Sequence, residues 1–305
     1  MPNIWTHILF CEEIMDVMDN KEEYLRMDGY LKLGSQGPDP FFYHNFWPWK
    51  KDDRVNQIGS SIHTEHCGPF LMDMIESGSR LSSKGKAYIL GFVTHHILDR
   101  NTHPYIHYRA GYEGNKHQEL EVIIDTLMME RNRNMNTWKV PAYKEINVGR
   151  FLDREIEQLL YRHIQTYFPE KTAALPDDFI QQSYRDMRMA LKILFDPYRW
   201  KNVLLSSTIS SFSHQPVRKN KDYLNEGHHT WHHPATNEPD TRSFLDLYEQ
   251  SKNEGMKIIS AIIDHWKHPD QRSIQSIESM VDNISYDTGK PLVQKLKNIY
   301  SSPIV

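Results

Sequence analysis

The sequence has little cysteine, little glycine and no long hydrophobic run. Its 305 residues include two cysteines, Cys11 and Cys67, which are too few and too far apart for a disulfide framework, so a reducing compartment is expected. The first ten residues lack a basic start followed by an apolar run, and they are not typical of a secretory signal. No stretch approaches the roughly 18 apolar residues that a membrane span requires. We therefore expect a cytoplasmic protein without a transmembrane segment.

An excess of basic residues is also missing. The chain has 36 Lys and Arg against 40 Asp and Glu, which gives a formal net charge of −4. Proteins that bind duplex nucleic acid without sequence preference rely on a strong basic field. Duplex nucleic acid is therefore not expected as a partner.

Apolar residues recur at helical rather than strand spacing along most of the chain. The pattern predicts helices near residues 4–19, 57–78, 84–103, 115–132, 149–167, 177–194, 198–212, 241–265 and 289–301. Two stretches rich in helix-breaking residues, 34–40 and 215–241, are expected to be long loops. Because no repeat or low-complexity linker divides the chain, we predict one all-α domain over residues 1–305. In it, the helices from about 149 to 301 pack around the N-terminal part.

Histidine, by contrast, is abundant, with 17 residues. Three of them form a stripe with one carboxylate at intervals of four residues: His95, Asp99, His103 and His107. Four residues turn a helix by about 400°, so these side chains share one face. Because the surrounding residues are apolar, the stripe would be buried and would need polar partners, which a metal can supply. Pro104 is expected to end or bend the helix at His103.

A second pair, His117 and Glu121, also places two metal-binding groups on one helical face. Further candidates lie upstream: His7, Asp39 in the first loop, and either His63 or His66 beside Cys67. Taken singly, each is more often an ordinary core, surface or turn residue, as Asp39 between two prolines illustrates. Their occurrence in order within the first 125 residues favours a metal site.

Two other patterns are noted. Residues 41–49 contain six aromatic side chains, which either line a cleft or lipid-facing surface or simply pack on the helices. Residues 227–234 contain four histidines, which either line the site or belong to a solvated loop. Packing and solvation are the simpler interpretations of the two patterns.

The ordered residues resemble the bacterial zinc-dependent phospholipase C family, which is related to clostridial alpha-toxin and to single-strand-specific nucleases. The resemblance covers roughly residues 5–125. It rests on the following residues in chain order: Trp5 with His7, Asp39, His63, His95 with Asp99, His103 with Pro104, and His117 with Glu121. The family is all-helical and binds zinc in a cleft, so two or three zinc ions are implied.

The resemblance also implies a role for each residue. The implied groups are His63, His95 and Asp99 for one zinc, with Asp39 as a further ligand or general base; His7 with a bridging Asp99 for a second zinc; and His103, His117 and Glu121 for a third. Asp39 and Asp99 are thereby the candidate catalytic residues. His107 remains a rival of His103 because the spacing after Asp99 is short, and His66 remains a rival of His63.

One departure concerns Trp5. In the secreted relatives a processed N-terminal Trp binds zinc through its own amine, whereas four residues precede Trp5 here. The leading prediction is a zinc-dependent hydrolase of phosphate esters that resembles phospholipase C and uses a metal-activated water, with phospholipid as one substrate class. The alternatives are a nuclease or phosphomonoesterase on the same scaffold, or a metal-binding helical protein without turnover.

Overall fold

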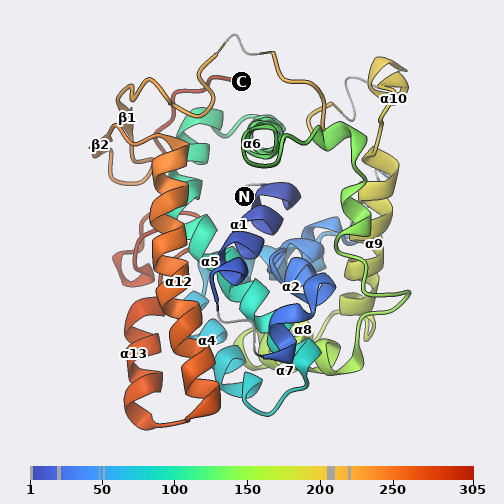
Figure 1. Cartoon of the computed structure of the whole chain (residues 1–305). Coiled ribbons are helices and arrows are strands. Elements are labelled where there is room, and N and C mark those ends of the chain that lie inside the picture. Colours follow the sequence, from blue (N-terminus) through green and yellow to red (C-terminus); the bar gives the residue numbers. More distant parts are fainter. Residues whose placement is uncertain (1–2, 19–21, 48, 51, 205–209, 219–220) are drawn as a thin grey trace.

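The computed structural model of the protein describes residues 3–18, 22–47, 49–50, 52–204, 210–218 and 221–305 (Figure 1). Over these residues the fold is built of helices, which confirms the all-α prediction. The strands β1 (Trp231–His232) and β2 (Pro239–Asp240) form a short antiparallel pair in the loop before the C-terminal helices.

Helix α5 (Ser83–Ala110) lies at the centre of the fold (Figure 1). Its N-terminus is capped by Ser82, whose hydroxyl accepts a hydrogen bond from the Gly85 N–H. Most of its 28 residues are buried, because other helices cover it on several sides. These helices are α1 (Ile4–Asp16), α2 (Asp28–Gly34), α4 (Cys67–Gly78), α6 (Lys116–Arg133), α7 (Arg154–Tyr167) and α12 (Phe244–Lys267).

Helices α2 and α5 approach each other closely. A Cβ atom at Gly91 would lie 2.2 Å from the carbonyl oxygen of Leu31, and one at Gly34 would lie 2.1 Å from the carbonyl oxygen of Tyr88. Only glycine permits this distance between the two backbones. The contact brings residues 35–38 and the following 3-10 helix η2 (Asp39–Tyr43) against the middle of α5.

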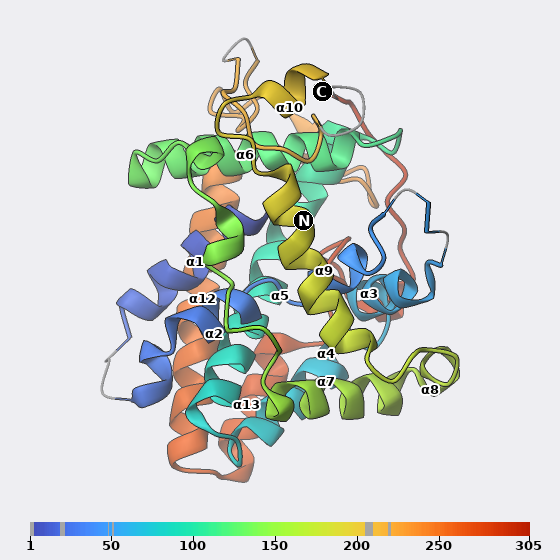
Figure 2. The same ribbon diagram turned by 90° about the vertical axis from the view of Figure 1, so that its right-hand side faces the viewer.

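The remaining helices surround this centre. They are α3 (Arg54–Thr64), α8 (Pro169–Thr172), α9 (Phe179–Leu194), α10 (Trp200–Leu204) and α13 (Gln271–Val281). Helices α3 and α9 pack on η2, and α13 pairs with α12. Figure 2 shows α9 in front and α6 running across the upper part of the molecule, below α10. Buried apolar side chains from α1 through α13 form one continuous core.

Several predicted helix boundaries are wrong. Helix α5 continues through Pro104 to Ala110, because its burial by neighbouring elements outweighs the lost hydrogen bond of a mid-helix proline, about 3 kcal/mol. The single helix predicted over 57–78 is two helices, α3 and α4, separated at His66, whose φ of 53° is left-handed. Helices α2 and α13 were not predicted; both are short.

The predicted helix over 289–301 is also wrong, since only the 3-10 turn η5 (Leu292–Gln294) forms there. The backbone N–H groups of Ile299 and Tyr300 instead donate to the carbonyl oxygen of Pro234. Just beyond the predicted helix, those of Ser302 and Ile304 donate to the carbonyl oxygens of Tyr108 and Arg109 at the end of α5. Tertiary hydrogen bonds therefore replace helical ones in this segment. The helix predicted over 198–212 is described only in part: α10 ends at Leu204, and residues 205–209 lie outside the described residues.

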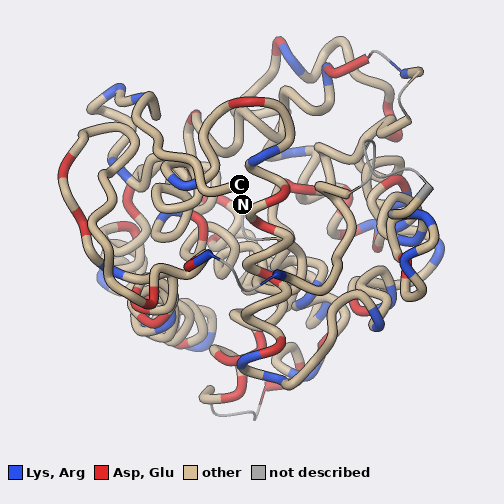
Figure 3. Tube along the Cα trace, turned by 90° about the horizontal axis from the view of Figure 1, so that it is seen from above, with Lys and Arg blue, Asp and Glu red and all other residues tan. Residues whose placement is uncertain are grey.

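The surface carries charges of both signs. Lys and Arg alternate with Asp and Glu around the periphery in the view of Figure 3. Among the helices that the structure describes, none is both long enough and apolar enough to cross a bilayer.

Candidate metal centre

Imidazoles and carboxylates from four α-helices, the 3-10 helix η2 and one loop meet beside the middle of α5. Within each of four groups, the donor atoms lie within 4.8 Å of one another: His7, His95 and Asp99; Asp39, His63 and His95; His103, His117 and Glu121; and His103, His107 and Asp287. The structure thus brings together all eight residues singled out from the sequence. The groups also include His107, the rival of His103, and Asp287, which the sequence did not indicate.

Asp99 is the common neighbour of the histidines. Its Oδ1 lies 3.3 Å from Nε2 of His7 and 3.7 Å from Nε2 of His103. Its Oδ2 lies 3.1 Å from Nε2 of His95 and 3.8 Å from Nε2 of His63. The carboxylate is fully buried, so it faces these rings rather than water. One carboxylate can therefore serve two adjacent groups, one through each oxygen.

Backbone carbonyls orient three of these rings. Nδ1 of His63 lies 2.7 Å from the carbonyl oxygen of Gly59, and Nδ1 of His95 lies 3.0 Å from that of Ser35. Nδ1 of His103 lies 3.1 Å from the carbonyl oxygen of Tyr286. Because a carbonyl only accepts, each Nδ1 carries the proton and each Nε2 keeps its lone pair. The lone pairs point toward Asp99, as ligation of a metal requires.

The first turn of α1, which carries His7, is held by a residue that sequence analysis missed, Asp125 of α6. Its carboxylate accepts hydrogen bonds from the backbone N–H of Trp5 at 2.9 Å and of Thr6 at 2.9 Å, and from the Thr6 hydroxyl at 2.5 Å. A negative charge at the first turn of α1 also stabilises the helix. The Trp5 nitrogen is therefore engaged by this carboxylate. Asp125 follows Glu121 by one helical turn, which is the only sequence signal that pointed to it.

Asp39 begins η2 and faces the same centre. Its Oδ1 lies 3.7 Å from Nε2 of His63 and 3.7 Å from Nε2 of His95. Burial raises the pKa of Asp39 to about 7. Asp99 behaves in the opposite way: burial pushes its pKa up, but His103, His95 and His7 outweigh burial and hold the pKa well below its usual range. The two carboxylates thus differ in proton affinity in the metal-free protein.

Most of the histidines are held neutral. Burial, reinforced by the neighbouring His95, lowers the pKa of His7 to about 4, and burial lowers the pKa of His103 to about 3. His95 is the exception, because Asp99 and Asp39 outweigh burial and raise its pKa. Neutral imidazoles at pH 7 offer lone pairs to a metal without first losing a proton.

The third group joins α5 to α6. Nε2 of His117 lies 2.6 Å from Oε1 of Glu121, one turn further along α6, and the rings of His103 and His117 are 5.8 Å apart. The rival His107 lies in a separate group with His103 and Asp287. Glu121 and His103 are almost completely buried.

His66, the rival of His63, lies outside the donor groups. His66 is exposed and its ring is near those of Tyr167 and Phe168, whereas His63 is buried among the donor residues. Cys67 is buried, and its thiol donates to the carbonyl oxygen of Ile62. The structure therefore places His63 at the centre and His66 outside it.

The aromatic run at residues 41–49 and the histidine cluster at residues 227–234 lie at the edge of the site or beyond it. In the aromatic run, Phe42 has its ring 5.4 Å from that of His63, while Trp49 is 69% exposed; Pro48 lies outside the described residues. In the histidine cluster, Nδ1 of His228 contacts the carbonyl oxygen of Thr241, and Nε2 of His233 contacts that of Thr288. These histidines belong to none of the four donor groups.

The donor set fits a metal. Among the described residues, several buried polar atoms lack a hydrogen-bond partner, namely both oxygens of Asp99, both ring nitrogens of His7, Oδ1 of Asp39, and Nε2 of His95 and His103. Buried polar groups without partners are costly, so native proteins rarely keep them together. Imidazole nitrogens with carboxylate oxygens are the ligand types that zinc prefers.

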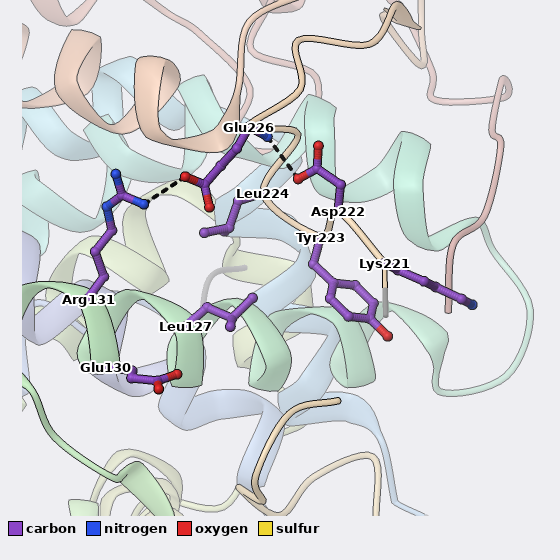
Figure 4. Close-up of a pocket in the computed structure, with 8 residues that line it drawn as sticks. All are labelled: Leu127, Glu130, Arg131, Lys221, Asp222, Tyr223, Leu224 and Glu226. Atoms are coloured by element: carbon purple, nitrogen blue, oxygen red, sulfur yellow. Dashed lines mark hydrogen bonds and ion pairs between the residues drawn. The ribbon is translucent and has the colours of Figure 1, made fainter. Parts of the chain in front are cut away.

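A cavity of about 350 Å³ lies at a different place, between α6 and residues 221–226 (Figure 4). Its lining includes charged residues of both signs, and two of them, Arg131 and Glu226, form an ion pair. The eight lining residues shown in Figure 4 do not include any member of the four donor groups.

Comparison with known proteins places the centre in a family context. Residues 6–171 match the family model described as zinc dependent phospholipase C. The matched segment includes every donor residue except Asp287. No curated protein and no solved structure shows a significant match.

Proposed function

The chain belongs to the zinc-dependent phospholipase C family, and from this membership together with the geometry of the centre we propose that it is a zinc-dependent hydrolase of phosphate esters, with phosphodiesters as the preferred substrates. The observation that carries the proposal is the placement of Asp99, fully buried with four imidazole Nε2 atoms within 3.8 Å of its two oxygens. Such a carboxylate suits a bridge between two metal ions.

Three ions would be held by residues of this chain. We assign His63, His95, Asp99 and Asp39 to the first, His7 with Asp99 to the second, and His103, His117 and Glu121 to the third. When bound, zinc lowers the pKa of a coordinated water and neutralises charge on the phosphoryl oxygens.

Asp39 is the proposed general base. Its Oδ1 is buried, lies beside His63 and His95, and has no hydrogen-bond partner among the described residues. In the proposed reaction the Asp39 carboxylate accepts a proton from the attacking water. The water oxygen forms a bond to phosphorus, the ester P–O bond breaks, and the leaving alkoxide takes up the proton that Asp39 accepted, which yields the alcohol and restores the carboxylate.

A reconstitution assay tests the proposal. Protein treated with a chelator is supplied with zinc, manganese, nickel or iron and assayed on a choline phosphodiester, a phosphomonoester and single-stranded DNA. We expect zinc to restore hydrolysis, with the choline phosphodiester cleaved fastest. Faster cleavage of DNA or of the monoester would instead support the nuclease or phosphomonoesterase alternative.

A matched pair of variants controls the assay. His63→Gln removes a proposed ligand, whereas His66→Gln alters the neighbouring exposed histidine. Turnover should fall at least 100-fold in the first variant and stay unchanged in the second. Zinc binding by the wild-type protein without turnover on any substrate would contradict the proposed activity and favour a non-catalytic metal protein.

A further inference from the structure

A segment beyond the family match lies against the candidate centre. We call residues 283–290 the strap. The N–H of Tyr286 donates to the carbonyl oxygen of His63 at 3.1 Å, and Nε2 of His96 lies 3.0 Å from the carbonyl oxygen of Ile284. The N–H of Ser285 donates to the carbonyl oxygen of Lys290 at 3.1 Å, which closes the strap on itself. The backbone of the strap is thus fixed relative to α3 and α5.

Asp287 of the strap faces α5. Its Oδ1 lies 3.5 Å from Nδ1 of His103 and 4.0 Å from Nε2 of His107. The carbonyl oxygen of Tyr286 lies 3.1 Å from the same Nδ1 of His103. One ring nitrogen therefore has two acceptors from adjacent residues of the strap.

His103, His107 and Asp287 could bind a further metal ion, or Asp287 could orient the ring of His103. The number of lone pairs on His103 decides between these two functions. A neutral imidazole has one N–H and one lone pair. Nε2 of His103 is buried without a hydrogen-bond partner, lies 3.7 Å from Asp99, and belongs to the side of the ring that faces the metal centre. Because Nδ1 faces two acceptors, it holds the proton. His103 then cannot bind one ion through Nε2 and a second through Nδ1.

We infer that Asp287 is a positioning residue for His103 and that His103, His107 and Asp287 do not form a fourth metal site. The carboxylate and the Tyr286 carbonyl accept from the Nδ1–H, which fixes the ring and makes Nε2 a stronger ligand. This inference rests on the metal centre of the proposed function but not on its hydrolytic activity.

The size of the effect follows from the geometry. Substitution of such outer partners lowers metal affinity by about 10–100-fold. Asp287→Ala removes the negative charge but keeps the carbonyl oxygen of Tyr286, which is the nearer of the two acceptors of the His103 Nδ1–H. The expected loss of affinity for one zinc ion is therefore about tenfold, at the lower end of this range.

A zinc titration against a chromophoric chelator tests the inference on the full chain. Asp287→Ala and Asp287→Asn should each weaken one equivalent of zinc about tenfold and leave the others unchanged, and Asp287→Glu should restore part of the affinity. Asp282→Ala, at an exposed residue just before the strap, should match the wild type. His107→Gln should bind as many zinc ions as the wild type. The melting temperature of the metal-free protein should not change in Asp287→Ala.

Several results would overturn the inference. Wild-type affinity in Asp287→Ala would show that the carboxylate does not act on His103. Complete loss of one zinc equivalent in both Asp287→Ala and His107→Gln would establish a fourth ion instead. A lower melting temperature of metal-free Asp287→Ala, together with weaker binding of every zinc ion, would show that Asp287 has only a structural role. If the wild-type protein binds zinc but hydrolyses nothing, the proposed activity fails while the role of Asp287 is still decided by affinity.

Discussion

Nε2 of His7 lies 3.3 Å from Oδ1 of Asp99, although the two residues come from different helices, α1 and α5. The same carboxylate reaches His95 through its other oxygen, and the rings of His7 and His95 stack at 4.2 Å. Two donor groups therefore share His95, and Asp99 of the first group lies 3.8 Å from Nε2 of His63 in the second, so a change at either residue should affect both groups together.

Asp99→Asn should remove more than one zinc ion per chain and abolish zinc-dependent turnover. The amide keeps the size of the side chain but lacks the negative charge that two cations require. Elemental analysis after equilibrium dialysis measures the zinc content. Asp282→Asn, at an exposed carboxylate of the same chain, should retain all zinc. Unchanged zinc content in Asp99→Asn would exclude the bridging role.

Asp125→Ala should destabilise the metal-free protein by about 3 kcal/mol or more. The substitution leaves the N–H of Trp5 and the hydroxyl of Thr6 buried without this acceptor. His214→Gln removes only one partner of the carboxylate, at 3.0 Å, and should cost about 1 kcal/mol. Urea unfolding measures both values. A cost below about 1 kcal/mol for Asp125→Ala would mean that this carboxylate does not anchor α1.

Gly37→Ala should weaken zinc binding as well as stability. Gly37 has a φ of 50°, and a Cβ there would lie 2.3 Å from Cδ2 of His95, so the ring must move. Gly114→Ala is the matched control, because Gly114 has a φ of 55° and nothing within 4 Å of the added atom. Both variants should lose about 1 kcal/mol from the left-handed backbone. Only Gly37→Ala should lose zinc affinity, and equal affinity in the two variants would contradict the predicted displacement of His95.

Zinc uptake should release a proton from Asp39 in a pH-dependent manner. Because burial raises the pKa of Asp39 to about 7 in the metal-free protein, the group is largely protonated at pH 6 and largely ionised at pH 8.5. A metal binds the ionised form. Calorimetry in buffers of different ionisation enthalpy gives the number of protons released. The wild type should release about one proton more than Asp39→Asn at pH 6, and this difference should approach zero at pH 8.5. A difference that does not depend on pH would contradict the raised pKa.

Local spacing explains why part of the centre could be predicted. The pairs His95 with Asp99 and His117 with Glu121 lie within single helices, whose geometry fixes which side chains share a face. Their position along the sequence was therefore sufficient to place them together. The prediction of helices over most of the chain succeeded for the same reason, since apolar periodicity is a local property.

Non-local contacts explain what could not be predicted. The sequence favoured a helix end at Pro104 and a helix over 289–301, yet α5 continues to Ala110 and the C-terminal segment bonds to its last carbonyls. Asp125 and Asp287 carry no motif, and they acquire a function only where the fold places them, against Trp5 and His103.

The sequence by itself determined the helical class and the order of the donor residues, because both depend on spacing along one chain. Only the tertiary structure decided that His95 is shared between two donor groups, that His63 rather than His66 faces the centre, and that the strap reaches His103. The physical reason is that buried polar atoms must find partners, and in a folded chain those partners come from segments that are distant in sequence.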